Sequence, residues 1–291
     1  MIKIYFVPSH DPTREYRLIE QGIMNNPRVE LVDSEKESDF VFQFYYRSKH
    51  KQFYKQKFPP EKTVVIDYHD SSRWISPVKC FAYFKRSWVK MVDKGNYTIK
   101  RPVSFPSHFY PLNFAIMDEF IINENLERDI ILSCTLRTHL GRFNRERVLN
   151  LIKGMNIKGK TQIGELNKEG ARGFNAPLMR DYWKLLRRSK IVITCNPSKW
   201  EGDHRTWEAF ANGALVFIDK IYTPMVHPLV DGKHCIFYEL SDLGLKELRE
   251  KILYYLDHTA QAEAIAKRGF DFTMKYHRAS NRIDEILERI L

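Results

Sequence analysis

The stretch from Ser189 to Asp219, SKIVITCNPSKWEGDHRTWEAFANGALVFID, decides how the rest of the sequence is interpreted. Its apolar ends, 190–195 and 214–219, predict two buried strands. Between them a charged loop leads into a helix expected at 205–211, which an Asn-Gly pair ends. In α/β proteins, a loop and helix start of this kind bind phosphate, because backbone N–H groups and the helix dipole face the ligand.

Charged side chains of this stretch are the candidate ligand-binding groups. Arg205, at the start of the expected helix, would add a charge-assisted contact to a phosphate. Glu208, on the same helix, could accept hydrogen bonds from the hydroxyl groups of a ribose. A solvated helix carboxylate is the alternative interpretation of Glu208. The residues by themselves therefore predict a nucleotide site.

The run EGDHRTWEA at 201–209 resembles the donor-site signature of GT-B glycosyltransferases, most closely the group-1-like and exostosin-like families. The resemblance covers about the last 160 residues, and its specific motif about thirty of them. It implies that Glu208 holds the donor ribose and that Asp203, His204 and Arg205 lie near the sugar or diphosphate. Many retaining members carry two glutamates eight positions apart, whereas Glu201 and Glu208 are seven apart. The donor-site role of Glu201 and a retaining outcome are therefore both open.

A second basic segment, CTLRTHLGRFNR at 134–145, follows an expected strand. Guanidinium groups suit phosphate oxygens better than ammonium groups do, so Arg137 and Arg142 are candidates for the diphosphate. Arg145 is less favoured, because it is expected to lie already on the following helix. A solvated basic turn is the alternative.

No metal site is expected. The sequence lacks an Asp-x-Asp motif, and its ten histidines show no HExxH or comparable ligand spacing. The resemblance to GT-B enzymes implies that arginines and a helix N-terminus stabilise the leaving diphosphate instead. The expected co-substrate is a nucleotide sugar, with no other cofactor.

Strand-like and helix-like segments alternate along the chain, which predicts an α/β fold with two Rossmann-like domains facing across a cleft. We expect an acceptor-side domain at 1–115, because the prolines of RPVSFPSHFYPLN at 101–113 break any regular element. Residues 116–291 form the expected nucleotide-sugar domain. The resemblance to GT-B proteins implies that its last helix, about 271–291, packs back on the first domain.

The expected elements of the first domain are strands at 2–7, 40–45, 63–67 and 80–84 and a helix at 14–24. Those of the second are helices at 117–129, 144–153, 179–188, 205–211, 245–257 and 259–291, the last one bent, and strands at 129–134, 160–163, 190–195 and 214–219.

A catalytic base is expected in Asp67-Tyr68-His69-Asp70, where a strand of the first domain ends. Asp70 could deprotonate an acceptor hydroxyl if burial raised its pKa, and His69 is the alternative base. A turn-capping aspartate and a loop histidine, or a metal-ligand set, are the other interpretations. His10 and Asp11 are the next candidates.

The net charge of +11 indicates an anionic partner. The aromatic and basic stretch YYRSKHKQFYK at 45–55 could stack on a sugar acceptor or on nucleic-acid bases, or could be a solvated helix. A nucleic-acid or polyanion-binding protein is therefore one rival function. A catalytically inactive glycan-binding module is another.

The combined prediction is a metal-independent, inverting hexosyl- or pentosyltransferase that moves a sugar, from a UDP-sugar by preference, to a glycan or glycoprotein hydroxyl. Compact chains of this kind are similar to glycosyltransferases that large algal viruses encode for capsid glycans, including a xylosyltransferase, so UDP-xylose is a candidate donor. No apolar run is long enough for a signal peptide or a membrane span. Four scattered cysteines suggest no disulfide framework. We therefore expect a soluble cytoplasmic protein without nucleic-acid partners.

Overall fold

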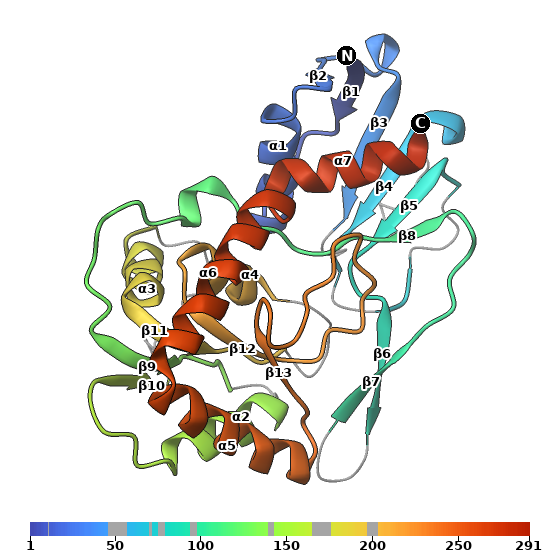
Figure 1. The fold of residues 1–291 in the computed structure, drawn as a ribbon. Helices are drawn as coiled ribbons and strands as arrows, with labels where there is room; N and C mark the ends of the chain where they lie inside the picture. Colours follow the sequence, from blue (N-terminus) through green and yellow to red (C-terminus); the bar gives the residue numbers. More distant parts are fainter. Residues whose placement is uncertain are drawn as a thin grey trace.

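A computed structural model of the chain describes residues 1–10, 12–45, 57–69, 72–74, 79–93, 98–138, 143–164, 176–196 and 203–291. The first domain is built on a parallel sheet in the order β2-β1-β3-β4-β5-β8. Its elements are β1 (Ile2–Phe6), α1 (Arg14–Met24), β2 (Val29–Leu31), β3 (Phe40–Tyr45), β4 (Thr63–Asp67), β5 (Ala82–Lys85) and β8 (Phe109–Pro111). An antiparallel hairpin of β6 (Val89–Asp93) and β7 (Thr98–Pro102) projects from it beside the second domain (Figure 1).

The second domain contains another parallel sheet, in the order β10-β9-β11-β12-β13. Its elements are β9 (Ile130–Cys134), α2 (Phe143–Lys153), β10 (Thr161–Ile163), α3 (Ala176–Arg188), β11 (Ser189–Ile193), α4 (His204–Ala211), β12 (Leu215–Asp219), β13 (Ile236–Tyr238), α5 (Asp242–Asp257), α6 (Thr259–Tyr276) and α7 (Ala279–Ile290). Two parallel sheets with helices on their faces confirm the α/β prediction.

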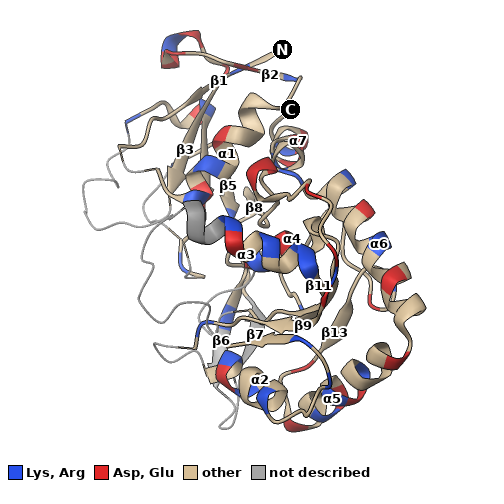
Figure 2. Ribbon diagram, turned by 90° about the vertical axis from the view of Figure 1, so that its left-hand side faces the viewer, with Lys and Arg blue, Asp and Glu red and all other residues tan. Residues whose placement is uncertain are grey.

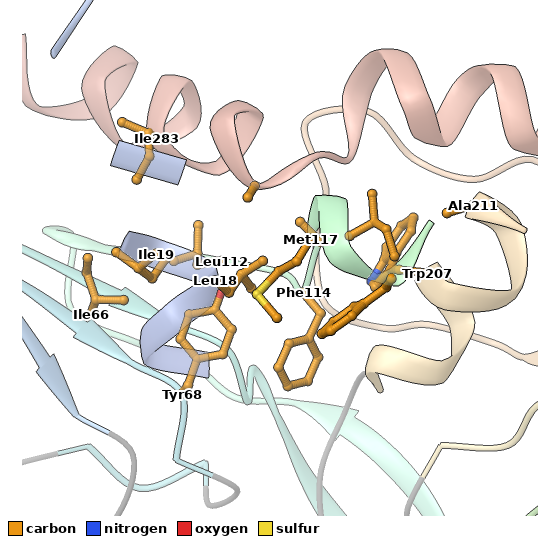
Figure 3. Packing of buried hydrophobic residues seen from close by; sticks show 14 of the residues in the cluster. Leu18, Ile19, Ile66, Tyr68, Leu112, Phe114, Met117, Trp207, Ala211 and Ile283 are labelled. Atoms are coloured by element: carbon orange, nitrogen blue, oxygen red, sulfur yellow. The ribbon is translucent and has the colours of Figure 1, made fainter. Parts of the chain in front are cut away.

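Burial explains why the central strands read as unbroken apolar runs. All five residues of β4 and of β12 are buried, as expected for strands covered on both faces. One apolar cluster continues from the first domain into the second. Figure 3 shows it passing from Tyr68 through Phe114 and Met117 to Trp207 on α4. The two domains therefore share part of one core.

Chain crossings between the domains hold α7 against α1. Ile116 donates its N–H to the carbonyl of His277 at 2.9 Å, and Ala279 donates to the carbonyl of Ile116 at 3.0 Å. Gly22 of α1 allows the helices to approach closely, because a Cβ there would lie 2.5 Å from the carbonyl oxygen of Ala279. As a result, α7 lies on the first domain although it follows the second (Figure 1).

Two expectations are wrong. The helix expected at 117–129 is absent apart from a 3-10 turn at Asp118–Phe120. Phe120 and Ile122 are buried in the shared core, and their backbone groups bond to the Asn212 side chain of the second domain, the Ile122 N–H at 3.1 Å and the Phe120 carbonyl at 3.0 Å, instead of forming helical hydrogen bonds. The prolines at 101–113 do not exclude strands either. Pro102 ends β7 of a two-stranded hairpin and Pro111 ends the edge strand β8, where a missing N–H is tolerated.

Within the described residues, no helix is long and apolar enough to cross a membrane. Cys134 and Cys195 are buried. Burial raises the pKa of the Cys134 thiol to about 12, so this thiol is protonated at neutral pH.

Candidate functional site

A pocket that opens to solvent lies between the domains, where the strands of both sheets end. The first domain contributes Arg86, which follows β5, and the linker contributes Asn113 and Phe114. The second domain contributes Asn196, which follows β11, and Ile221 and Met225, which follow β12. It also contributes the start of α4, with Asp203, Thr206 and Trp207. Carboxyl ends of parallel strands are the usual ligand-binding edge of such sheets.

The start of α4 forms the charged border of this pocket. Asp203 is the N-cap, and its Oδ1 accepts the Arg205 N–H at 3.1 Å. The guanidinium groups of Arg145 and Arg205 both form ion pairs with the Asp203 carboxylate. Burial alone would raise the pKa of Asp203, but these two cations lower it well below its usual range. The carboxylate is therefore ionised at neutral pH.

Arg145, in the first turn of α2, is the arginine that reaches this border. It is 1% exposed, and its Nε donates to the Cys195 carbonyl at 2.8 Å. Arg137 is exposed, and Arg142 lies outside the described residues. The sequence had ranked Arg145 below both. Helical spacing is the signal that indicates a buried Arg145, because this residue shares the i, i+3, i+4 stripe of α2 with Val148 and Leu149.

Glu208 lies on α4, one turn further along, and is 1% exposed. It forms an ion pair with Arg14, the first residue of α1 in the other domain. Apart from this pair, neither carboxylate oxygen accepts a hydrogen bond from the described residues. Burial lowers the pKa of the Arg14 guanidinium to about 10, so it stays charged. Glu208 thus faces the domain interface with hydrogen-bonding capacity left over.

His204 and Glu15 form a second contact between α4 and α1. The His204 Nε2 lies 3.3 Å from the Glu15 Oε1, and the His204 ring packs on Phe114 with centroids 4.0 Å apart. Burial and the Arg14 charge lower the pKa of His204 to about 4. The neutral imidazole therefore fits this interface at physiological pH. Figure 2 shows basic positions recurring on α3, near the centre of the view.

Only some of the candidate catalytic bases lie within the described residues. Asp70, Asp11 and Glu201 lie outside the described residues, whereas His10 and His69 are exposed. The backbone of His69 is fixed: its N–H donates to Asp67 Oδ1 at 2.8 Å, and its carbonyl accepts from Lys85 Nζ at 3.1 Å and Ser87 Oγ at 3.0 Å. The His69 backbone is thereby anchored at the end of β4.

Among the described residues, no group of three or more His, Cys, Asp or Glu side chains could hold a metal ion. The sequence 45–55 falls almost wholly outside the described part of the chain, which includes only Tyr45 at the end of β3.

The stretch that includes α4 resembles known proteins in sequence, and the whole fold resembles known structures. Residues 164–288 match the family model described as glycosyl transferase-like. No curated protein matches the chain by sequence. The solved structures that resemble it include Anabaena HepE in complex with UDP and glucose, with a TM-score of 0.59, 10% identity and coverage of 99% of each chain.

Two further solved structures also align with this chain over nearly the full length of both proteins. Sucrose-phosphate synthase from Thermosynechococcus elongatus has a TM-score of 0.58 and 8% identity, covering 100% of this chain and 99% of its own. An α-glucosyltransferase in complex with UDP and a 13-mer DNA has a TM-score of 0.57 and 11% identity, covering 99% and 98%. TarM is longer: this chain spans 55% of its length, with 12% identity, 79% of this chain covered and a TM-score of 0.49.

The fold is GT-B. Its two parallel sheets and the helix that returns to the first domain extend over the full length of neighbours such as HepE. Within this GT-B fold, α4 and the residues after β11 lie inside the stretch that matches the family model. Arg14, Glu15 and Arg145 lie before it and complete the charged group from outside.

Proposed function

We propose that the protein is a glycosyltransferase that moves a sugar from a nucleoside-diphosphate sugar to a hydroxyl group of a glycan or glycoprotein. The observation that carries this proposal is the group of Arg145, Asp203 and Arg205 at the start of α4, beside the interdomain pocket. Uridine is the favoured base, since HepE and the α-glucosyltransferase are both bound to UDP. Xylose as the sugar, and a place in the glycosylation of a viral capsid, are finer forms of the same proposal.

In the proposed reaction an acceptor oxygen attacks the anomeric carbon while the bond from that carbon to the diphosphate breaks. Asp70, or His69 beside it, takes the acceptor proton. Arg145 and Arg205, with Arg137 and Arg142 as further candidates, neutralise the leaving diphosphate together with the N-terminus of α4. No metal ion is needed in this scheme. A single displacement of this kind inverts the anomeric configuration.

A thermal-shift screen with UDP, GDP and oligonucleotides, followed by a UDP-release assay in EDTA, tests the proposal. A nucleotide at about 100 times its Kd stabilises the folded state by about 2.7 kcal/mol, which raises the melting temperature by several degrees. We expect this shift with UDP, and UDP release from a UDP-sugar that persists in EDTA.

The rival functions give other patterns. Stabilisation by oligonucleotides but not by nucleotides would support a nucleic-acid-binding protein, which the net charge of +11 favours. Binding of glycans without UDP release would support an inactive glycan-binding module. Loss of activity in EDTA that manganese or magnesium restores would reject the metal-independent mechanism.

A further inference from the structure

Asn196 is a buried polar side chain whose amide none of the described residues pairs with. It follows β11, is 1% exposed and borders the interdomain pocket. Its backbone N–H donates to Asp219 Oδ1 at 2.7 Å, which fixes the residue in place. Neither Oδ1 nor Nδ2 of the Asn196 amide has a hydrogen-bond partner among the described residues. Buried amides are normally paired, so this one requires an explanation.

Each of the other polar side chains that line the pocket has at least one partner. The Asn113 Nδ2 donates to the Pro224 carbonyl at 2.8 Å, and the Arg86 Nε donates to the Tyr68 carbonyl at 3.2 Å. The hydroxyl of Thr206 lies 3.3 Å from that of Thr194. Asn196 is therefore the lining side chain with both a donor and an acceptor to offer to a ligand.

The remaining walls are apolar. Phe114, Trp207, Ile221 and Met225 line the same pocket, and the Trp207 ring is held from outside by His277, with centroids 4.3 Å apart. Apolar walls around a few convergent polar groups are typical of small-molecule sites.

We propose that this pocket holds one sugar ring and that Asn196 determines which pattern of hydroxyl groups it accepts. A hydroxyl group both donates and accepts, so neighbouring hydroxyls of one ring can pair with the amide N–H and the amide oxygen together. Asp203 borders both the pocket and the proposed diphosphate position, which makes the ring the sugar of the donor. This assignment to the donor rests on the proposed function.

Titration calorimetry of the whole protein, with UDP, UDP-glucose, UDP-xylose and the free monosaccharides as probes, tests the proposal on Asn196→Ala and Asn196→Leu. UDP affinity should stay within about twofold of the wild type, while the affinity for the preferred UDP-sugar falls roughly tenfold. The preference between the two UDP-sugars should shrink as well. Asn196→Leu should not lower the melting temperature, because an apolar side chain of similar size removes an unpaired buried amide.

Asn212→Ala is the matched control. Asn212 is equally buried, but its amide is bonded to the carbonyls of Phe120 and Glu208 and to the Ile122 N–H, outside the pocket. This variant should lose stability and keep the wild-type ratio of UDP-sugar to UDP affinity.

The outcomes separate the two proposals. Weaker binding of a free monosaccharide, with the UDP-sugars unaffected, would support the pocket and assign the ring to the acceptor. If both Asn196 variants keep the wild-type ratio of UDP-sugar to UDP affinity, the inference about Asn196 is overturned. UDP binding by the wild type would still support the proposed function. If the wild type binds no UDP, the proposed function fails, and the monosaccharide titration still tests the pocket.

Discussion

Two buried charged groups lie on opposite sides of the cleft, and they differ in how completely their hydrogen-bonding groups are used. At the ends of β4 and β5, Asp67 accepts from the Tyr83 hydroxyl at 2.6 Å and from Lys85 Nζ at 2.9 Å. One buried cation here meets one buried anion, and the carboxylate also holds the His69 backbone. A balanced group of this kind fixes the chain locally.

The group at the start of α4 differs in another respect. Its three guanidinium groups, on Arg14, Arg145 and Arg205, are matched by three carboxylates, those of Glu15, Asp203 and Glu208, but some of its hydrogen-bonding groups are unused. Glu208 accepts no hydrogen bond beyond its ion pair, and the nearby Asn196 amide has none from the described residues. Buried charged side chains with unused hydrogen-bonding groups beside them distinguish a site prepared for a polar ligand from a structural network.

The largest expected effects come from removing the buried cation on each side. Lys85→Met should cost about 3–5 kcal/mol in the free energy of unfolding, because the buried Asp67 carboxylate loses its cation, and Arg145→Met should cost less, because Asp203 keeps its ion pair with Arg205. Only Arg145→Met should weaken UDP binding, by roughly tenfold to a hundredfold. Urea unfolding and calorimetry measure the two quantities.

Milder variants keep this comparison testable if either protein fails to fold. The double variant Asp67→Asn/Lys85→Met removes both charges of the first pair and should recover part of the stability with normal UDP affinity. Arg145→Lys keeps a charge near Asp203 but cannot also bond the Cys195 carbonyl, so it should fold and bind UDP more weakly. Equal losses of UDP affinity on both sides would remove the distinction between the two groups.

A smaller effect is expected from His204 as the pH falls. Its pKa is about 4 in the folded protein, against an ordinary value of 6.5. Between these values the unfolded chain holds a proton that folded His204 lacks, so stability is lost as the pH falls from about 6.5 to about 4. The loss is at most about 3 kcal/mol, at 1.36 kcal/mol per pKa unit.

Denaturant unfolding of the wild type and His204→Gln across this pH range measures that loss. Glutamine cannot titrate, so the variant should show a flatter profile between pH 6.5 and 4. Glu15, whose pKa is lowered by its hydrogen bond to His204 despite burial, loses its own contribution only below about pH 4.5. Parallel profiles would mean that His204 is already protonated in the folded protein.

The smallest effect concerns Glu208. Glu208→Ala should weaken UDP binding by about 1.5–3 kcal/mol, because the ribose loses a charged hydrogen-bond acceptor. Arg14→Ala sharpens the test, since it frees the same carboxylate from its ion pair and should leave the UDP affinity equal or higher. A Glu208→Ala protein with the wild-type Kd for UDP would exclude Glu208 from the nucleotide site.

Local signals explain which elements could be predicted. The helix at 14–24 and the strands at 40–45 and 63–67 have the expected bounds, and Thr13 caps the helix by accepting from Tyr16 N–H. Gly213, with a φ of 73°, ends α4 where the sequence predicts. The helix expected at 117–129 failed because burial against both domains, which no local pattern reports, holds that segment extended.

The site was less accessible to sequence reasoning. Asp203, Arg205 and Glu208 could be selected because they surround a recognisable helix start. The pairing of Arg14 with Glu208 depends on how two domains dock, and the unpaired state of Asn196 depends on every neighbour around it. Neither property is encoded in the spacing of nearby residues.

The two chain crossings between the domains meet at one place. Ile116 and Arg278 lie side by side in a short parallel bridge, so both crossings are tied together there. Ala279, the first residue of α7, donates to the Ile116 carbonyl and also lies against Gly22 of α1. The path of the chain between the domains and the seat of α7 on α1 are therefore set by the same few backbone contacts.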